Sequence, residues 1–287
     1  MAFNFKTCSR NVHQITTDFA RVGDHQDFLL LSDVHWDNPH CNRDLLKRHL
    51  DEAVERDAGI IVIGDLLCLM EGRADGRATK NVRPEHLHNY FDAVISTAAE
   101  WFEPYKDHLL VIGQGNHETA VRKHQETDMV ERLCQAMRLR GSAVQPGGYS
   151  GFIRFSFNVT SSRLSQLMFY HHGYGGGGRT TRGTGHFAAY QHMVGGRVDI
   201  FASGHVHAKE CFPHNVVTLS RANKIEQQTI HCVRLGTYKD EYVDGYDGWH
   251  VEKGRGPRPL GGYWLRFDYA NQLKHKKFVG RTFTEAS

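Results

Sequence analysis

Short apolar runs that end abruptly in polar residues constrain the fold of this chain more than any other feature of its sequence. The first run covers residues 28–31 and leads into Asp33-Val34-His35. Such runs are typical of buried strands. In an extended chain Asp33 and His35 would point to the same side, because side chains alternate between the two faces of a strand. The other polar clusters that follow apolar runs are Gly64-Asp65, Gly115-Asn116-His117-Glu118, His171-His172-Gly173 and Gly204-His205-Val206-His207.

Amphipathic segments separate the strands of the first half, which predicts an α/β fold. Residues 42–56 carry apolar side chains at helical spacing, and Asn42 is expected to cap this helix. Further helices are expected over 86–101 and over 119–138, with Gly141 as a stop. Alternating strands and helices favour parallel strands with right-handed crossovers. In such sheets, ligand sites form at the carboxyl ends of the strands.

The second half is richer in strands and predicts a second sheet that packs on the first. Residues 148–157 alternate large apolar side chains with smaller or polar ones, the pattern of a strand with one exposed face. Other strands are expected near 215–219, 229–234 and 263–267. Residues 236–262 show little periodicity and are expected to form a long surface segment.

The length of 287 residues is close to the upper size of a single hydrophobic core. We expect one domain over 1–287, with a core at about 28–235 and a C-terminal extension of strands and loops over 236–287. The net charge of +3 gives only weak support for a polyanionic partner such as nucleic acid. The oligomeric state cannot be read from the sequence.

Cysteine usage and the absence of targeting signals predict a cytoplasmic protein with no membrane partner. The six cysteines show no C-x-x-C spacing, which fits reduced thiols rather than a zinc knuckle. The start of the chain lacks the pattern of a secretory signal. No apolar stretch approaches the roughly 20 residues that a membrane span needs.

Histidine is unusually frequent, with 20 in the chain, and several stand in the polar clusters. Taken singly, each cluster can be a turn or a helix cap. A lone buried histidine is also more often a hydrogen-bonded core residue than a ligand. Five clusters in this order make coincidental turn chemistry a poor explanation. Imidazole, carboxylate and amide donors suit divalent metals, and two ions that share one carboxylate stand about 3.5–4 Å apart and can activate a bridging water.

The order of these clusters resembles the calcineurin-like metallophosphoesterase superfamily, whose pattern is D-x-H, G-D-x-x-D, G-N-H-D/E, H and G-H-x-H. The resemblance covers about residues 28–208. It implies an α/β fold in the form of a four-layer αββα sandwich with two mixed β-sheets, and a dinuclear metal centre at the carboxyl ends of the strands. More narrowly, residues 33–37, the glycine-rich stretch after His172 and Gly248-Trp249-His250 resemble a branch common among phage-encoded members.

The resemblance also implies a set of metal ligands. Of the neighbours His171 and His172, we favour His172 because it stands directly before Gly173, as in the common H-G form of the family. His171 stays the alternative. The other implied ligands are Asp33, His35 and His207 for the first metal, Asn116 and His205 for the second, and Asp65 as the bridge between them.

His117 has a separate implied role, because in the family it faces the phosphate and acts as a general acid rather than as a ligand. The family orients this histidine with the last Asp of G-D-x-x-D, but Cys68 stands at that position here. A thiol is a poor hydrogen-bond acceptor. Metal binding is therefore better supported than full catalytic power, and Glu118 is one candidate for the missing carboxylate.

We expect the chain to be a hydrolase: a metal-dependent phosphoesterase that cleaves phosphate esters by attack of a metal-bound hydroxide. Manganese is the favoured cofactor, with iron, zinc and nickel as alternatives. Arg179 and Arg182, beside the glycine run at 175–178, suit phosphate contacts and favour phosphodiester substrates, which would include nuclease activity on nucleic acid. The alternatives are a phosphomonoesterase or protein phosphatase, and a metal-binding scaffold with weakened catalysis.

Overall fold

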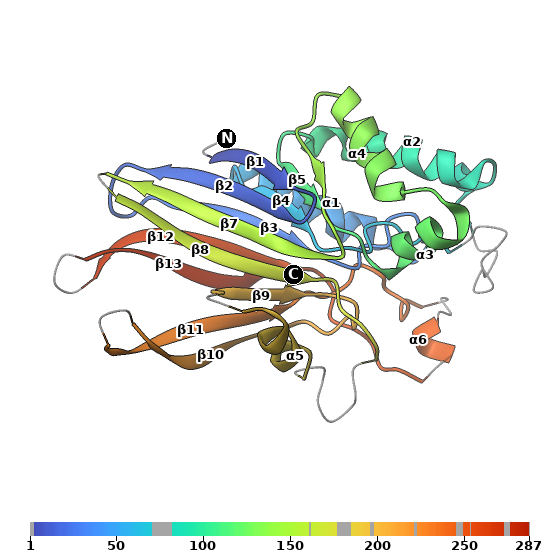
Figure 1. Cartoon of the computed structure of the whole chain (residues 1–287). Helices are drawn as coiled ribbons and strands as arrows, with labels where there is room; N and C mark the ends of the chain where they lie inside the picture. Colours follow the sequence, from blue (N-terminus) through green and yellow to red (C-terminus); the bar gives the residue numbers. More distant parts are fainter. Residues whose placement is uncertain are drawn as a thin grey trace.

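Two mixed β-sheets lie face to face, and helices pack on their outer faces (Figure 1). The predicted substrate contacts Arg179 and Arg182 lie outside the described residues, as does Gly248. The computed structural model describes residues 3–70, 82–160, 162–176, 185–195, 198–220, 223–244, 249–252, 254–272 and 276–286.

The six-stranded sheet has the first three apolar runs of the sequence at its centre. Its strands β3, β4 and β5 are parallel neighbours, and β12 pairs with β3 in the antiparallel direction. Every residue of β4 and β5 is buried, which explains why these runs are apolar without alternation. In sheet order, the strands are β13 (Lys276–Glu285), β12 (Tyr263–Gln272), β3 (His25–Leu31), β4 (Gly59–Val62), β5 (Leu109–Ile112) and β6 (Gln145–Pro146).

The seven-stranded sheet is built mainly from the second half of the chain, as the sequence predicts. Strand β9 runs parallel to its neighbours β8 and β11, whereas β7 and β8 are antiparallel. In sheet order, the strands are β1 (Phe3–Ser9), β2 (Val12–Phe19), β7 (Ser150–Val159), β8 (Ser162–His171), β9 (Ile200–Ser203), β11 (Ile225–Arg234) and β10 (Glu210–Leu219).

Local signals set the helix ends. Asn42 caps α1 as predicted, because its side-chain oxygen accepts a hydrogen bond from the Leu45 amide at 3.0 Å. The single helix predicted over 119–138 is wrong: Glu126 adopts a left-handed backbone with φ of 55°, and Asp128 caps a second helix. No helix within the described ranges is both long and apolar enough to cross a membrane. The helices are α1 (Arg43–Glu55), α2 (Tyr90–Phe102), α3 (Asn116–Gln125), α4 (Met129–Leu139), α5 (Gly185–Met193) and α6 (Trp249–Glu252), with short 3-10 turns η1 (Pro84–His86) and η2 (Glu103–Tyr105).

Three apolar clusters separate four layers. The first joins the helical layer to the six-stranded sheet and includes Leu50 and Leu133. The second fills the space between the sheets and includes Phe28 and Phe155. The third lies on the outer face of the seven-stranded sheet, where Phe187 of α5 packs. The predicted four-layer αββα sandwich with two mixed sheets is thus confirmed.

Both ends of the chain add strands to the sheets, outside the expected core of 28–235. Strand β12 pairs with β3 at the centre of one sheet, and β2 pairs with β7 in the other. The prediction that 236–262 is a surface segment is wrong in part. Thr237 and Tyr238 are fully buried, and the Thr237 hydroxyl donates to the backbone oxygen of Asp33 at 2.7 Å. Hydrogen bonds rather than apolar periodicity hold these residues inside.

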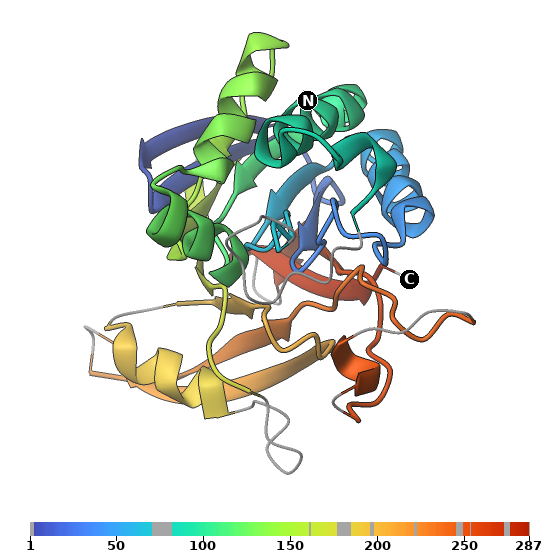
Figure 2. The ribbon, with the colours of Figure 1, turned by 90° about the vertical axis from the view of Figure 1, so that its right-hand side faces the viewer.

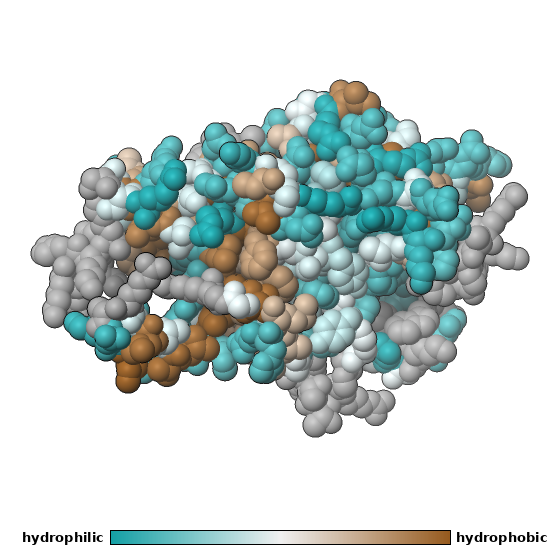
Figure 3. Space-filling model, viewed as in Figure 1, coloured by the Kyte–Doolittle hydropathy of each residue, from teal (hydrophilic) through white to brown (hydrophobic). Residues whose placement is uncertain are grey.

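The β10–β11 hairpin exposes apolar side chains. Val217 and Leu219 are each 69% exposed and Ile225 is 77% exposed. Leu219 pairs with Ile225 across the hairpin. In Figure 3 the lower-left end of the molecule, where this hairpin lies in Figure 1, is correspondingly brown. An exposed apolar cluster of this kind is a feature of contact surfaces.

We expect Phe28→Ala to lower the free energy of unfolding by about 3–5 kcal/mol, because it empties the centre of the cluster between the sheets. The Phe28 ring lies 5.0 Å from the Phe155 ring, centroid to centroid, and 6.0 Å from that of Phe267. The matched control is Phe278→Ala on β13, whose side chain is 42% exposed. Urea denaturation measures both. Equal losses in the two variants would contradict the assigned core.

Candidate metal centre

The polar clusters singled out in the sequence meet at one edge of the sandwich. They follow the carboxyl ends of β3, β4 and β5 in one sheet and of β8 and β9 in the other. This edge faces the viewer in Figure 2. Backbone hydrogen bonds join two of the loops. The Asp33 amide donates to the backbone oxygen of Gly64 at 3.1 Å, and the His35 amide donates to the backbone oxygen of Asp65 at 3.0 Å.

Left-handed backbone conformations mark these loops. Residues other than glycine rarely adopt positive φ, although Asp and His tolerate it better than most. Each such residue costs about 1–3 kcal/mol and persists only where its surroundings enforce it, which is common at functional sites. The residues in question, with their φ values, are Asp33 (52°), His35 (50°), Asp65 (50°), His205 (71°) and His207 (54°).

A first group of donor atoms comes from Asp33, His35 and His207, whose ligand atoms all lie within 4.8 Å of one another. His207 Nε2 lies 3.3 Å from Asp33 Oδ1 and 3.4 Å from His35 Nε2. Asp33 Oδ2 accepts a hydrogen bond from the His205 amide at 2.8 Å. Asp33 Oδ1 is buried and accepts no hydrogen bond from the described residues. Asp33 Oδ1 and the Nε2 atoms of His35 and His207 therefore face one another, and together they could hold a cation.

A second group comes from Asp65, Asn116, His172 and His205. His172 Nε2 lies 3.2 Å from Asp65 Oδ2 and 3.1 Å from Asn116 Oδ1. Asn116 Oδ1 also lies 2.7 Å from His205 Nδ1. The other nitrogen of His172, Nδ1, lies 2.9 Å from the backbone oxygen of Ile63. A proton on Nδ1 donates to this oxygen, so that in the neutral ring Nε2 is free to bind a metal.

His171 points away from these donors. Its Nδ1 accepts a hydrogen bond from the Gly173 amide at 3.0 Å, and its ring stacks on Tyr190 with centroids 5.0 Å apart. It belongs to neither donor group. The structure thus brings His172 and not His171 to the site.

Two glycines let the backbone come close to the carboxylates. A Cβ at Gly115 would lie 2.0 Å from Asp65 Oδ1, and one at Gly204 would lie 2.4 Å from Asp33 Oδ2. Any side chain at either position would push the carboxylate out of place. Glycine in the G-N-H and G-H-x-H clusters is therefore required by the packing of the two aspartates.

Burial and charge pairing set the pKa values of the site. Burial would raise the pKa of Asp65, but His172 and His117 lower it well below its usual range. Burial would lower the pKa of His172, but the Asp65 carboxylate raises it to about 10. Burial lowers the pKa of His35 well below its ordinary value and also lowers that of His205. Both of these imidazoles are therefore neutral near pH 7, the form that binds a metal, whereas the His172 ring would release a proton when it binds one.

The donors fit divalent cations. Carboxylate and amide oxygens with imidazole nitrogens suit manganese, iron, zinc and nickel. Two almost fully buried carboxylates, Asp33 and Asp65, need positive charge close by. The Asp65 carboxylate lies 3.2 Å from His172 of the second group, and the backbone oxygen of Asp65 accepts a hydrogen bond from the amide of His35 in the first group at 3.0 Å. Asp65 thus lies beside residues of both groups.

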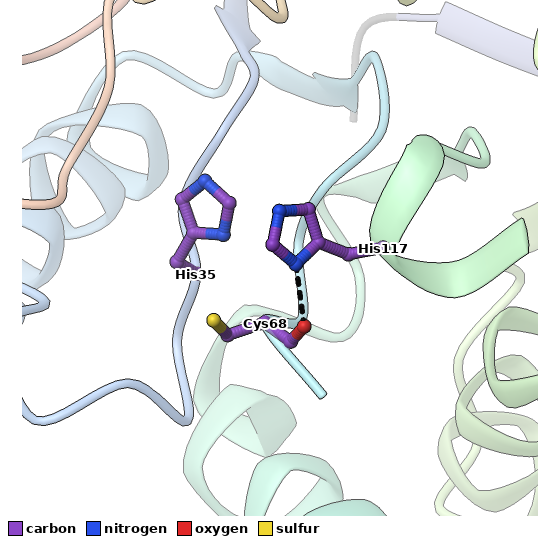
Figure 4. A group of neighbouring side chains, drawn as sticks. All are labelled: His35, Cys68 and His117. Atoms are coloured by element: carbon purple, nitrogen blue, oxygen red, sulfur yellow. Dashed lines mark hydrogen bonds between the residues drawn. The ribbon is translucent and has the colours of Figure 1, made fainter. Parts of the chain in front are cut away.

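His117 is held by the backbone of Cys68. Its Nδ1 lies 2.6 Å from the Cys68 carbonyl oxygen and donates to it (Figure 4). Its Nε2 lies 3.8 Å from Asp65 Oδ2, toward the donor groups. A carbonyl oxygen thus holds this histidine, where the resemblance noted in the sequence implies a carboxylate at position 68, and Glu118 does not take this role.

Glu118 instead supports the loop that carries Asp65. The fully buried carboxylate accepts hydrogen bonds from the amides of Asp65 at 3.1 Å, Leu67 at 3.0 Å and Gly115 at 2.8 Å. Burial and the Asp65 charge raise the pKa of Glu118 to about 8, and the amide donors oppose this rise. Glu118 therefore fixes the relative positions of the β4 and β5 loops.

Asp37 is a supporting residue that was not among the predicted site residues. It accepts hydrogen bonds from the amides of Cys68 and Leu69 and from the hydroxyl of Tyr90 at 2.7 Å. These bonds shape the loop that presents the Cys68 carbonyl to His117. Its position two residues after His35 is the sequence signal that could have indicated a role at the site. Thr237, which binds the Asp33 carbonyl, lies in an aperiodic segment that offered none.

No family model matches the sequence, and no curated protein matches it either. Solved structures with similar folds include Vps29 from Chaetomium thermophilum, with 9% identity, 91% of this chain and 96% of that chain covered, and a TM-score of 0.35. The Vps29 of Entamoeba histolytica complexed with Zn²⁺ is 11% identical, with 91% of this chain and 100% of that chain covered and a TM-score of 0.33. GAP50, the anchor in the inner membrane complex of Plasmodium, is 11% identical, with 91% of this chain and 85% of that chain covered and a TM-score of 0.43. Likenesses this distant carry no functional assignment.

We expect Glu118→Gln to lower the free energy of unfolding by about 1–3 kcal/mol, because the new amide group would face backbone N–H donors. Loss of this support should also weaken Mn²⁺ binding by about 10–100-fold. Urea denaturation and calorimetric Mn²⁺ titration measure the two effects. Glu100→Gln, at an exposed position of α2, is the control. Wild-type stability and affinity in Glu118→Gln would show that the three hydrogen bonds do not organise the site.

Proposed function

We propose that this protein is a dinuclear metal-dependent phosphoesterase. The observation that carries the proposal is the pair of donor groups beside one buried carboxylate, Asp65. Asp33, His35 and His207 would hold the first ion. Asn116, His172 and His205 would hold the second, and Asp65 would bridge them. When bound, two divalent ions would lower the pKa of a water between them and neutralise part of the charge on a phosphate group.

The chain's own residues support the remaining steps. The donor groups leave His117 Nε2 facing the same space, while its Nδ1–H is fixed on the Cys68 carbonyl. This tautomer fixes the ring orientation and leaves Nε2 to carry a second proton when the ring is charged. Nε2 would then hand that proton to the departing oxygen of the ester, which is general acid catalysis. His117 is thus proposed as catalytic, without binding a metal.

A phosphodiester with an aromatic group, such as a nucleotide, is the favoured substrate class. The Tyr174 side chain is 45% exposed, and its ring centroid lies 4.6 Å from that of His186. The next residue, Gly175, accepts a hydrogen bond from His205 Nε2 through its backbone oxygen at 2.9 Å. Tyr174 thus stands one residue before a backbone contact to a proposed ligand, and exposed aromatic faces suit base stacking. The predicted contacts of Arg179 and Arg182 stay part of the proposal, as do manganese as the cofactor and the narrower likeness to phage-encoded members.

A metal-binding scaffold is the second candidate, and the exposed β10–β11 hairpin is the observation that favours it. Val217, Leu219 and Ile225 would be the contact residues for another protein. The two candidates differ in chemistry. A scaffold binds Mn²⁺ without hydrolysing either a chromogenic monoester or a chromogenic diester, whereas the proposed enzyme hydrolyses at least one of them.

We expect Asp65→Asn to reduce Mn²⁺-dependent hydrolysis by about 1000-fold, because metal-ion catalysis supplies several kcal/mol of transition-state stabilisation. The measurement is the release of nitrophenol from bis(p-nitrophenyl) phosphate after Mn²⁺ loading. Asp107→Asn, at an exposed position, controls for the charge change and should retain wild-type activity. Equal rates in wild type and Asp65→Asn would exclude the proposed site.

We expect Tyr174→Ala to lower kcat/KM for thymidine 5′-(p-nitrophenyl phosphate) by about tenfold, because it removes a stacking surface for the base. The same variant should hydrolyse methyl p-nitrophenyl phosphate, which has no base, at the wild-type rate. Tyr174→Phe keeps the aromatic face and should restore the nucleotide substrate. Equal effects on the two substrates would contradict a base-stacking role.

A further inference from the structure

We propose that His35, Cys68 and His117 form a separate binding site for a thiophilic divalent cation such as Zn²⁺ or Cd²⁺, next to the dinuclear centre. One ring nitrogen from each histidine and the sulfur of Cys68 all lie within 4.8 Å of one another. The three residues come from three segments: the loop after β3, the loop after β4 and the first turn of α3. Figure 4 shows that their side chains converge.

His35 supplies an unpartnered polar atom that faces this cluster. The side chain is 2% exposed, and its Nδ1 is buried without a hydrogen-bond partner among the described residues. Its Nε2 is occupied elsewhere, since it lies 3.4 Å from His207 Nε2 in the first donor group. Histidines that bind metal through one nitrogen nearly always have a partner for the other. Nδ1 of His35 has no such acceptor among the described residues, so it is the atom open to a second cation, which would bind it in the deprotonated, bridging form of the ring.

Cys68 makes this cluster chemically different from the dinuclear centre. The thiol is buried, and the Asn38 amide group lies 3.4 Å from the sulfur. The dinuclear centre offers only nitrogen and oxygen donors. A thiolate with two imidazoles is instead a ligand set for zinc and cadmium. As the cation binds, the Cys68 thiol and Nδ1 of His35 each release a proton to solvent, the His117 ring releases its Nδ1 proton and takes one up on Nε2, and no oxidation state changes.

Occupation of this site would act on His117. The Nδ1 of His117 lies beside residue 68 because it donates to the Cys68 carbonyl oxygen at 2.6 Å. A cation bound to Nδ1 would replace that hydrogen bond and withdraw the ring from proton transfer. The consequence, which rests on the proposed function, is that a thiophilic cation inhibits hydrolysis even when the dinuclear centre holds Mn²⁺.

The binding claim is tested by ultraviolet absorbance, because only a thiolate ligand gives a sulfur-to-cadmium charge-transfer band. Cys8 is exposed, so Cys8→Ser is the parent and Cys8→Ser/Cys68→Ser the test variant. Both are loaded with saturating Mn²⁺ and titrated with Cd²⁺. We expect a band that saturates at one equivalent in the parent and is absent from the double variant. No band in the parent, or the same band in both proteins, would overturn the proposal.

A second variant guards against misfolding of the Cys68→Ser chain. Cys8→Ser/His117→Gln keeps the thiol and removes one imidazole, so the Cd²⁺ affinity read from the same band should fall by about tenfold. An unchanged affinity would exclude His117 from the site. Hydrolysis is measured separately. If the parent binds Cd²⁺ but shows no Mn²⁺-dependent hydrolysis, the proposed function is refuted and the cation site stands. If the parent is active but shows no band, the cation site is refuted and the proposed function stands.

Discussion

Two buried carboxylates, Asp33 and Asp65, dominate the physical chemistry of this molecule. Both are almost completely shielded from water at the edge where the two sheets meet. Buried charge of this kind is stable only when it is paired and hydrogen-bonded. The surrounding loops meet that demand, since the His205 and His117 amides donate to the two carboxylates and His172 lies 3.2 Å from Asp65. The same negative charge is what would attract divalent ions.

The sandwich explains why such an arrangement can exist. Parallel strands β3, β4 and β5 deliver three loops to one edge, and β8 and β9 deliver two more from the other sheet. Each loop alone would be free to move. Glu118, Asp37 and Thr237 connect them through buried hydrogen bonds, so that the donors are fixed before any ion binds. The strained φ values of the donor residues are the local cost of this rigidity.

The central strands and the location of the candidate site could be predicted from the sequence. Short apolar runs indicate buried strands, and the polar clusters after them indicate the edge of the sheet where the strands end. The α1 helix and its Asn42 cap also follow from local spacing. The break at Glu126 does not, since the charged residues of 119–138 are compatible with one helix or two. The hydrogen bond that orients His117 could not be predicted either. Its acceptor is the backbone oxygen of Cys68, and any residue type at position 68 offers such an oxygen. The burial of Thr237 likewise depends on a long-range hydrogen bond.

The central claim is that two cations bind on either side of Asp65. Anomalous diffraction from crystals soaked in Mn²⁺ tests it most directly, because it locates each ion without reference to activity. We expect two peaks about 3.5–4 Å apart. One peak should contact Asp33, His35 and His207, the other Asn116, His172 and His205, and both should contact Asp65. A single peak, or peaks that do not touch Asp65, would contradict the account.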